Sequence, residues 1–523
     1  MKGWNKALHA ADDLELRKPD WHSRPEQWRW RTTQQLMKTK VPALTLITLA
    51  ATLTIARSQP LGATAGTSNA PPLSPTEQTI QDIKNPFPWM TWGGDLRFRN
   101  EYFNDLLTLS EKNPLHEQDY FRFRGRLFTS ITPVDDLSLN ARLTAEPREW
   151  MKPAGYSTYK GNVGMAWYYG IFDAMNVQWK NIATLPLTVS VGRQDIFLGD
   201  GWLVGEGTPY DGSWTTFIDS ARVTYNFKEQ HTVVEAIGIV QDALNNSWMP
   251  IINTSGATTL TEQNEKGAIL SVANSSVPAA NVTGYFIYKH DDFVAKYGDN
   301  ADIYTFGARV SGTFEDHWKY SVEGAYQCGQ KEDPGLNHAG LSPYLSPAAQ
   351  AAGFRDMAAF AANTKLSYLF NDKLKNQVSL SYEFISGDNP NTKNDEMFDV
   401  LWGRWPRWSE IGLYIYAPEA RVGQEGNLHR FGPTWSVSPV KNLTFSTSYY
   451  ALFSDQNAAT RAVAPGLFTQ SGNFRGHFAQ AVLKYAFNKH LNGHLWGEVL
   501  FPGDYYVIRT VIPFLRAEVT LTF

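Results

Sequence analysis

The chain of 523 residues carries a formal net charge of −4, which excludes the strong basic excess of a nucleic-acid-binding protein. Aromatic residues make up 14% of the sequence, yet mean hydropathy is −0.35 and no run of about 20 apolar residues follows the N-terminal region, which excludes a transmembrane helix there. The single cysteine, Cys328, excludes a disulfide framework and a metal site built from several cysteines.

The N-terminal region has the layout of an export signal. From Met37, two lysines precede a mostly apolar run over 41–56, and a small-residue cleavage site follows. We therefore predict a signal peptide over 37–65, with a short anchor helix as the alternative. Residues 1–36 fit no export signal and are interpreted as a mis-annotated start or a disordered extension. Residues 66–91 are interpreted as a Pro/Ser-rich linker.

From Trp92 onward, apolar and polar residues alternate in short runs that turn signals separate. In "DYFRFRGRLF", Arg122, Arg124 and Arg126 occupy every second position between mostly apolar side chains. The last run, "FLRAEVTLTF", sets apolar residues on one face against arginine, glutamate and threonine on the other, and it ends on Phe523. Alternation over many segments of about 10 residues is typical of a transmembrane β-barrel. A soluble secreted β-sandwich or β-helix is the alternative.

We predict an all-β protein, a closed antiparallel transmembrane β-barrel over residues 92–523 in the bacterial outer membrane. Its length allows about 16 to 18 strands around a water-filled lumen. Five short connections are predicted to be periplasmic turns, namely 132–136, 227–231, 314–318, 370–376 and 438–442. Three long segments are predicted to be outside loops or inward-folded lids, namely 242–283, 331–357 and 387–429.

The arginines of these strands are predicted to face the lumen, because an arginine on the lipid face near the midplane costs about 2–4 kcal/mol. One interpretation is a wall that lowers the barrier for an anionic solute, since rings of arginine or lysine select anions in pores. The other is an ordinary polar wall. In it the arginines pair with neighbouring carboxylates, namely Asp95, Glu101, Glu146 and Glu518.

The sequence offers few signals for catalysis or metal binding. His490 and His494 in "HLNGH" have a metal-like spacing, but Gly493 and the strand context favour a turn. The glycine-rich "GDGWLVGEG" lacks the following helix and the Lys-Ser/Thr pair of a phosphate loop. We predict no metal site, no cofactor and no enzymatic activity, although a hydrolase site assembled from distant residues stays open.

Several segments together resemble the alginate export family of bacterial outer-membrane porins. They include "WGGDLRFRNEYFND", "DYFRFRGRLFTSITPVDDLSLNARLTAE", "YEFISGDNPNTKNDEMFDVLWGR" and the Gly-Arg-Gln-Asp stretch at 192–195 followed by "LGDGWLVG". The resemblance implies an 18-stranded monomeric barrel with an electropositive constriction through which a polyuronate passes outward. It also implies periplasmic machinery that feeds the polymer, and loops or turns that gate the pore. The arginines that carry the resemblance, and form the candidate anion pathway, are Arg97, Arg99, Arg122, Arg124, Arg126, Arg142, Arg193, Arg222 and Arg309.

Two functions are compatible with these features. The first is passive passage of an anionic polysaccharide, an alginate-like polyuronate, in the direction of export. The second is a substrate-specific or general porin that imports small anions or oligosaccharides. Trp402, Trp405 and Trp408 would give the second function a sugar-stacking surface, or would belong to an interfacial aromatic belt. In both cases the partners are the solute and the lipid of the outer membrane.

Overall fold

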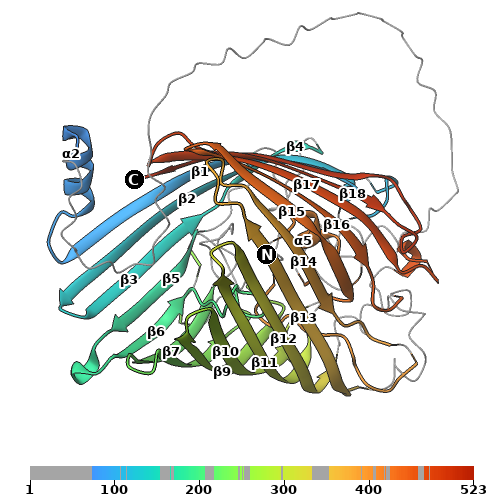
Figure 1. Ribbon diagram of the computed structural model, residues 1–523, viewed down its shortest axis with the longest axis horizontal. Coiled ribbons are helices and arrows are strands. Elements are labelled where there is room, and N and C mark those ends of the chain that lie inside the picture. Colours follow the sequence, from blue (N-terminus) through green and yellow to red (C-terminus); the bar gives the residue numbers. More distant parts are fainter. Residues whose placement is uncertain are drawn as a thin grey trace, which may run out of the picture.

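The computed structural model describes most of the chain from residue 73 onward (Figure 1). The described residues are 73–523 except 107, 114, 154–164, 166–169, 206–216, 245–247, 250, 253–259, 296–297, 333–352, 390, 405–407, 417–418, 420–423, 458–464 and 470. The predicted N-terminal extension and signal peptide therefore lie outside the described residues.

The strands pair with their neighbours in one antiparallel sheet (Figure 1). They are β1 (Met90–Asn104), β2 (Glu117–Val134), β3 (Leu137–Ala145), β4 (Arg148–Lys152), β5 (Gly170–Trp179), β6 (Leu187–Gln194), β7 (Ile218–Phe227), β8 (Thr232–Gln241), β9 (Gln263–Val277), β10 (Ala280–Phe293), β11 (Asn300–Phe314), β12 (Trp318–Glu332), β13 (Arg355–Leu369), β14 (Gln377–Ile385), β15 (Leu428–Val440), β16 (Leu443–Phe453), β17 (Phe474–Ala486), β18 (Leu491–Pro502) and β19 (Ile512–Thr522). Short helices are α2 (Pro75–Lys84), η1 (Ile182–Thr184), α5 (Ile411–Tyr414) and η3 (Pro465–Leu467). The first and last strands pair with each other, from Asp95 opposite Thr522 to Phe103 opposite Phe514. The sheet therefore closes, and the predicted all-β barrel is confirmed.

The named strands form a ring of 18, because β3 and β4 are two halves of one barrel strand. β2 pairs with β3 as far as Ala145 and with β4 from Arg148 onward. Pro147 separates the halves, since proline has no N–H to donate to the sheet. Glu146 lies at this break, and its side chain is fully buried inside the barrel. The ring has the number of strands that the family resemblance implied.

Short turns gather at one end of the barrel and long connections at the other. The start of β1 and the end of β19 lie at the short-turn end. Short turns face the periplasm in outer-membrane barrels, so the long connections mark the outer end. All five predicted periplasmic turns lie at the short-turn end, as expected.

The prediction of a long loop or lid over 242–283 is wrong for the second half of that segment. The segment 242–283 contains β9 and the start of β10. Its many small and polar residues concealed the alternation, in which Leu270 and Val272 are exposed on the outer face and Ser271 is buried between them. The segment 387–429 does form the connection between β14 and β15, except that its last two residues begin β15. Most of 331–357 lies outside the described residues.

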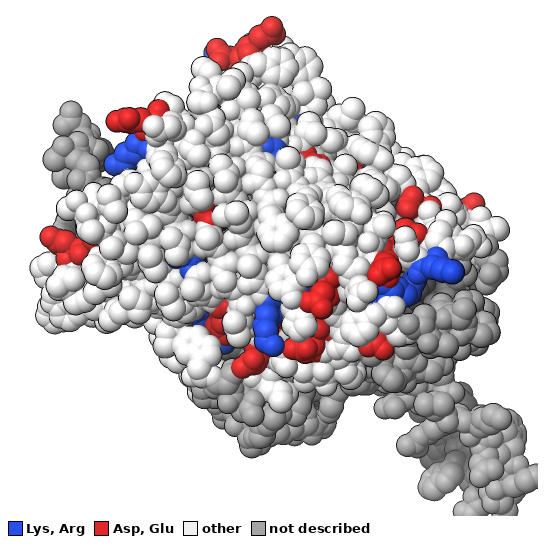
Figure 2. Space-filling view, turned by 90° about the horizontal axis from the view of Figure 1, so that it is seen from below, with Lys and Arg blue, Asp and Glu red and all other residues white. Residues whose placement is uncertain are grey.

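The outer surface is apolar, as a lipid-facing wall requires. On β1, Leu96 and Phe98 are 47% and 52% exposed, whereas Arg97 and Arg99 beside them are buried. Figure 2 shows one side of the barrel as a broad and largely uncharged band, with Lys, Arg, Asp and Glu gathered mainly along its margins. The arrangement follows from strand geometry, since successive side chains point to opposite faces of the sheet.

A short helix lies at the periplasmic end, within the stretch interpreted as a linker. Ser74 caps α2, because its Oγ accepts a hydrogen bond from Glu77 N at 3.3 Å. Glu77 binds Lys489 in the β17–β18 turn, and the hydrogen bond from Lys489 lowers the pKa of the Glu77 carboxyl. Among the described residues, no helix has the length and apolar character needed to cross a membrane.

Leu96→Arg tests the assignment of the lipid face. Leu96 lies near the middle of β1, and a guanidinium there would enter the hydrocarbon. We expect the free energy of unfolding to fall by about 2–4 kcal/mol, measured by reversible urea unfolding in lipid vesicles. Val440→Arg at the end of β15 is the control, with an expected loss of about 0–1 kcal/mol. Equal losses in the two variants would contradict the assignment.

Candidate pore-lining site

β1 and β2 place two rows of arginines side by side on the inner wall. Their register sets Arg97 opposite Arg124 and Arg99 opposite Arg122, and Arg126 continues the second row. The four opposed side chains are buried, with exposed fractions between 1% and 6%. Like charges directly opposed on neighbouring strands repel each other. The two rows are therefore stable only with carboxylates between them.

Glu146 supplies the first of these carboxylates. It accepts hydrogen bonds from Arg97 Nη2 at 3.0 Å and from Arg122 Nε at 3.1 Å. Arg148, on the far side of the Pro147 break, donates from Nη2 at 2.9 Å. The break in the third barrel strand thus places one carboxylate among three guanidinium groups.

Glu101 is shared in the same way. It accepts from Arg122 Nη1 at 3.1 Å, from Arg99 Nη1 at 3.3 Å and from Arg516 Nε at 2.8 Å. Arg516 lies on β19 and also donates from Nη1 to Glu410 at 2.9 Å. The closing strand and a long connection therefore both contribute to the same cluster.

Asp95 and Glu518 complete the cluster. Asp95 accepts from Arg124 Nη2 at 3.1 Å and from Arg126 Nε at 2.6 Å. Glu518 on β19 accepts from Arg99 Nε at 2.6 Å. The four carboxylates that the sequence offered as partners for the arginines are thus the ones that bind them.

We call this cluster the basic wall. Its arginines are Arg97, Arg99, Arg122, Arg124, Arg126, Arg148 and Arg516. Its carboxylates are Asp95, Glu101, Glu146, Glu410 and Glu518. Counted over these twelve described side chains, the arginines outnumber the carboxylates by two.

Two more of the predicted arginines lie on β3 and β6. Arg142 donates from Nε to Asp173 at 2.7 Å and holds both oxygens of Asp195 at 2.9 Å. Arg193 holds the two oxygens of Asp219 at 2.8 and 2.9 Å. Such two-bond pairs fix the plane of the guanidinium group.

The last two predicted arginines lie farther round the ring. Arg222 on β7 donates from Nε to Glu235 at 2.6 Å, and Arg309 on β11 donates from Nη2 to Asp200 at 2.7 Å. The structure thus brings five of the nine predicted arginines together in the basic wall. It leaves the other four in separate ion pairs along the inner face.

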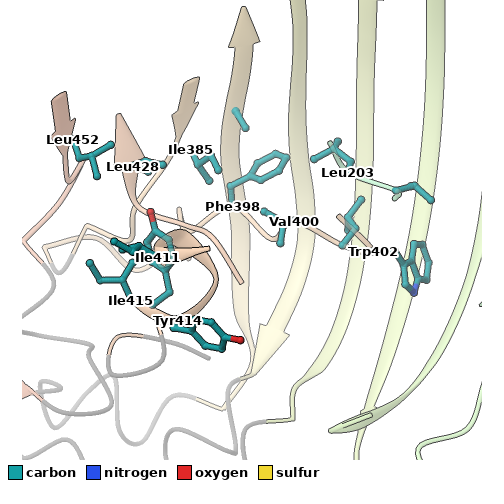
Figure 3. Packing of buried hydrophobic residues seen from close by; sticks show 14 of the residues in the cluster. Leu203, Ile385, Phe398, Val400, Trp402, Ile411, Tyr414, Ile415, Leu428 and Leu452 are labelled. Carbon is teal, nitrogen blue, oxygen red and sulfur yellow. The ribbon is translucent and has the colours of Figure 1, made fainter. Parts of the chain in front are cut away.

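Two long connections from the outer end fold into the barrel and pack against each other (Figure 3). The β6–β7 connection brings Leu203 and Val204, and the β14–β15 connection brings Val400 and Trp402, all of them buried. Trp402 N donates to Leu203 O at 3.1 Å, and Gly205 N donates to Trp402 O at 3.1 Å. This short parallel pairing joins the two connections within the apolar cluster.

The β14–β15 connection is bound to opposite walls. Arg404 Nη2 donates to Glu265 Oε1 on β9 at 2.8 Å. Five positions later, Ser409 Oγ donates to Glu498 Oε2 on β18 at 2.9 Å. β9 and β18 are diametrically opposite, since they are nine steps apart in either direction round the ring of 18. Side chains of both walls, Glu265 and Glu498, thus bind the described residues on either side of 405–407. We call the described residues 398–404 and 408–416 the crossing segment.

A single buried carboxylate holds the far end of the crossing segment. Besides Ser409, Glu498 accepts from the backbone N–H groups of Glu410 at 3.1 Å and Ile411 at 2.8 Å. Glu410 then reaches Arg516 of the basic wall. The crossing segment is therefore part of the same charge network as the predicted arginines.

Trp402 and Trp408 lie inside the barrel, so an interfacial aromatic belt is wrong for these two residues. Trp402 is 2% exposed, and its Nε1 donates to Glu265 Oε2 at 2.9 Å. Trp408 is half-buried, and its Nε1 donates to Glu425 Oε1 at 2.8 Å. The acidic partners on or near the inner wall hold both indoles in the lumen. Trp405 lies outside the described residues.

Sequence reasoning missed three members of the basic wall. Arg516 was recognisable, because "FLRAEVTLTF" places it on the same face as Glu518. Arg148 follows a proline, which hides its strand from an alternation pattern. Glu410 reaches the wall from a connection, and no local pattern marks it. Among the described residues, no group of three or more His, Cys, Asp or Glu side chains is arranged to hold a metal ion.

The family model described as alginate export matches residues 172–510. The chain belongs to the alginate export family. Together with the closed barrel, membership places this protein in the bacterial outer membrane as a channel. It also confirms the resemblance drawn from the sequence. A search of curated proteins found no match.

Solved structures of outer-membrane barrels are similar in overall shape. Pseudomonas aeruginosa OccK8 (OprE) is 12% identical with a TM-score of 0.49, and the alignment covers 83% of this chain and 98% of that one. The structure of Pseudomonas aeruginosa OpdK with vanillate gives the same four values. Acinetobacter baumannii OccAB1 is 10% identical with a TM-score of 0.48, covering 83% of this chain and 97% of that one.

Glu146→Gln tests the role of the shared carboxylate in the alginate export barrel. The change leaves three arginines with one negative charge fewer, so we expect the free energy of unfolding to fall by about 3–5 kcal/mol. We also expect the channel to become more selective for anions, measured as a shift of the reversal potential in a salt gradient. The control is Glu117→Gln, whose partner Lys152 lies at 2.8 Å with both side chains at least one-third exposed; a loss of about 0–1 kcal/mol is expected. Similar losses would show that Glu146 does not organise the wall.

Proposed function

We propose that this member of the alginate export family is a passive channel that carries an anionic polysaccharide, an alginate-like polyuronate, outward across the outer membrane. The observation that carries the proposal is the charge excess of the basic wall, where seven arginines share five carboxylates. Arginine or lysine on a pore wall lowers the barrier for anions. The excess would act in the same way on the carboxylates of a uronate polymer.

The nine predicted arginines would contribute in two ways. Those that are nearly fully buried set the electrostatic potential of the lumen. Arg126, Arg142, Arg222 and Arg309 keep between 13% and 33% of their side chains exposed, so solutes can reach them. A uronate carboxylate would bind such a guanidinium through charge-assisted hydrogen bonds and then exchange with the resident carboxylate, which keeps the contact transient.

Outward passage requires a supply of polymer at the periplasmic end. We therefore propose periplasmic export machinery as the partner of a monomeric channel. The sequence has no recognisable energy-coupling motif, so polymer would move down its gradient or be pushed by continued synthesis.

Import of small anions or oligosaccharides is the second candidate function. The crossing segment favours it, because a segment bound to both β9 and β18 narrows the passage left for a polymer. Vesicles loaded with mannuronate chains of about 20 units distinguish the two candidates. Release of the long chains supports export, whereas release of monomers and dimers alone supports import.

The triple variant Arg122→Ser, Arg124→Ser, Arg126→Ser tests the electrostatic role of the basic wall. We expect the anion-to-cation permeability ratio, obtained from reversal potentials in a salt gradient, to fall by about threefold or more. The matched control replaces Lys152, Lys266 and Arg355 with Ser, because these three cations are also ion-paired but lie near the outer ends of strands. An unchanged permeability ratio in the first variant would show that the basic wall does not determine the anion selectivity of the pore.

A further inference from the structure

A group of exposed apolar side chains lies at the periplasmic end of the barrel, on and beside α2. Within residues 73–89, Leu73, Ile83, Phe87 and Trp89 each keep between 46% and 52% of their surface exposed. Single exposed apolar residues are common in proteins, but several gathered in one short segment mark a contact surface. Figure 1 shows α2 outside the ring of strands and close to the C-terminus of the chain.

The barrel holds α2 at both of its ends. Near the start of the helix, Glu77 is buried and binds Lys489, and its Oε2 lies 3.2 Å from His490 Nε2. At the end of the helix, the carbonyl oxygen of Ile83 accepts a hydrogen bond from Trp92 Nε1 at 2.7 Å. These contacts join α2 to the β17–β18 turn and to β1. The orientation of the helix is therefore fixed by the barrel.

Trp92 places the end of α2 against the lipid-facing wall. Strand alternation puts Trp92 on the same face of β1 as Leu96 and Phe98, which are exposed on the outer surface. Its indole meets the ring of Phe523 edge-on, with centroids 5.5 Å apart. Phe523 in turn covers the outer side of Gly94, since a Cβ there would lie 2.8 Å from its ring. The last turn of α2 thus contacts the outer wall rather than the lumen.

The two sides of α2 differ in polarity. With about 3.6 residues per turn, Thr76, Ile80 and Ile83 lie on one side of the helix, which we call the apolar flank. Gln78 and Asp82 lie on the opposite side, where Gln78 Nε2 donates to Asp82 Oδ1 at 2.8 Å. An amphipathic helix that adjoins a lipid-facing wall has the character of a helix that lies in the membrane interface.

Two aromatic residues continue this apolar surface between α2 and β1. The rings of Phe87 and Trp89 stack, with centroids 5.0 Å apart and planes 1° from parallel. Met90 N donates to Phe87 O at 3.0 Å, so a tight turn holds both residues at the periplasmic start of β1. Tryptophan is enriched at membrane–water interfaces, because its ring contacts apolar atoms while its N–H reaches polar groups. The aromatic pair therefore suits the depth of lipid headgroups.

We propose that α2, Phe87 and Trp89 form an interfacial anchor, which lies in the headgroup layer of the periplasmic leaflet and fixes the rim of the barrel there. The partner is a phospholipid surface. Lipid is favoured over a periplasmic protein by continuity, because the anchor adjoins the lipid-facing wall at Trp92 and Phe523. Interfacial helices bury their apolar side about 5–10 Å into the boundary of headgroups and acyl chains. The anchor does not depend on which solute the channel carries.

Fluorescent probes on the two sides of α2 test the anchor. Thr76→Cys and Gln78→Cys are each labelled with nitrobenzoxadiazole in a Cys328→Ser background. The protein is placed in nanodiscs of phosphatidylethanolamine and phosphatidylglycerol, which leave both membrane faces open to quenchers. We expect a lipid with a spin label near its headgroup to quench the Thr76 probe about twofold more than the Gln78 probe. Iodide in the water should show the opposite order.

A triple variant tests whether the apolar side chains hold the helix in the interface. Ile83→Ser, Phe87→Ser and Trp89→Ser together should lower lipid quenching of the Thr76 probe to the level of the Gln78 probe, because the apolar surface that enters the lipid is lost. The contacts that attach α2 to the barrel use none of these three side chains, so the helix stays in place beside β1.

The matched control, Gln78→Ser with Asp82→Ser, changes the opposite side of α2 and should leave lipid quenching of the Thr76 probe as it is. Equal lipid quenching of the two probes in the unaltered helix would overturn the anchor. Unchanged quenching in the triple variant would overturn it as well. If iodide reaches both probes equally and the spin-labelled lipid reaches neither, the apolar flank faces water, and a periplasmic protein replaces lipid as its partner.

Discussion

The structure depends on one constraint, that no backbone N–H or C=O group can be left unpaired in the hydrocarbon of a membrane. Pairing of β1 with β19 meets this constraint by removing both edges of the sheet. Closure then leaves each strand with one face in lipid and the other in the lumen. This is why phenylalanine and arginine alternate from Phe121 to Arg126: the two residue types are adjacent in sequence but face different solvents.

A second constraint follows from the first, because polar side chains confined to the lumen must balance one another's charge. The arginine rows of β1 and β2 would repel without Glu101, Glu146 and Asp95 between them. The same solution recurs in the crossing segment, whose two ends are held by the buried carboxylates Glu265 and Glu498. Buried acidic groups thus organise both the wall and the connection that spans it.

Much of this architecture could be predicted from the sequence, because period-two alternation is a local property. It identified the barrel, its inner face and the four acidic partners of the arginine rows. Prediction from alternation failed for residues whose position in the barrel is not indicated by the sequence around them. β9 was missed because small residues such as Ser271 and Ala273 weaken its alternation. The placement of Trp402 and Glu410 was missed because distant carboxylates and arginines draw a long connection into the lumen.

Carboxylates hold the cations of the inner wall, and the way each cation is held follows from its chemistry. A guanidinium presents several donors in a fixed plane, so it is well suited to be held by two carboxylates at once, as Arg99 is. Such a group changes the potential of the lumen, but a solute must displace a resident partner to bind it. The buried lysines of the inner wall are held by carboxylates as well, since Lys289 binds Asp291 at 2.6 Å and Lys331 binds Asp399 at 3.1 Å. Both kinds of cation therefore keep fixed positions on the inner wall, because the carboxylates that balance their charge also hold them in place.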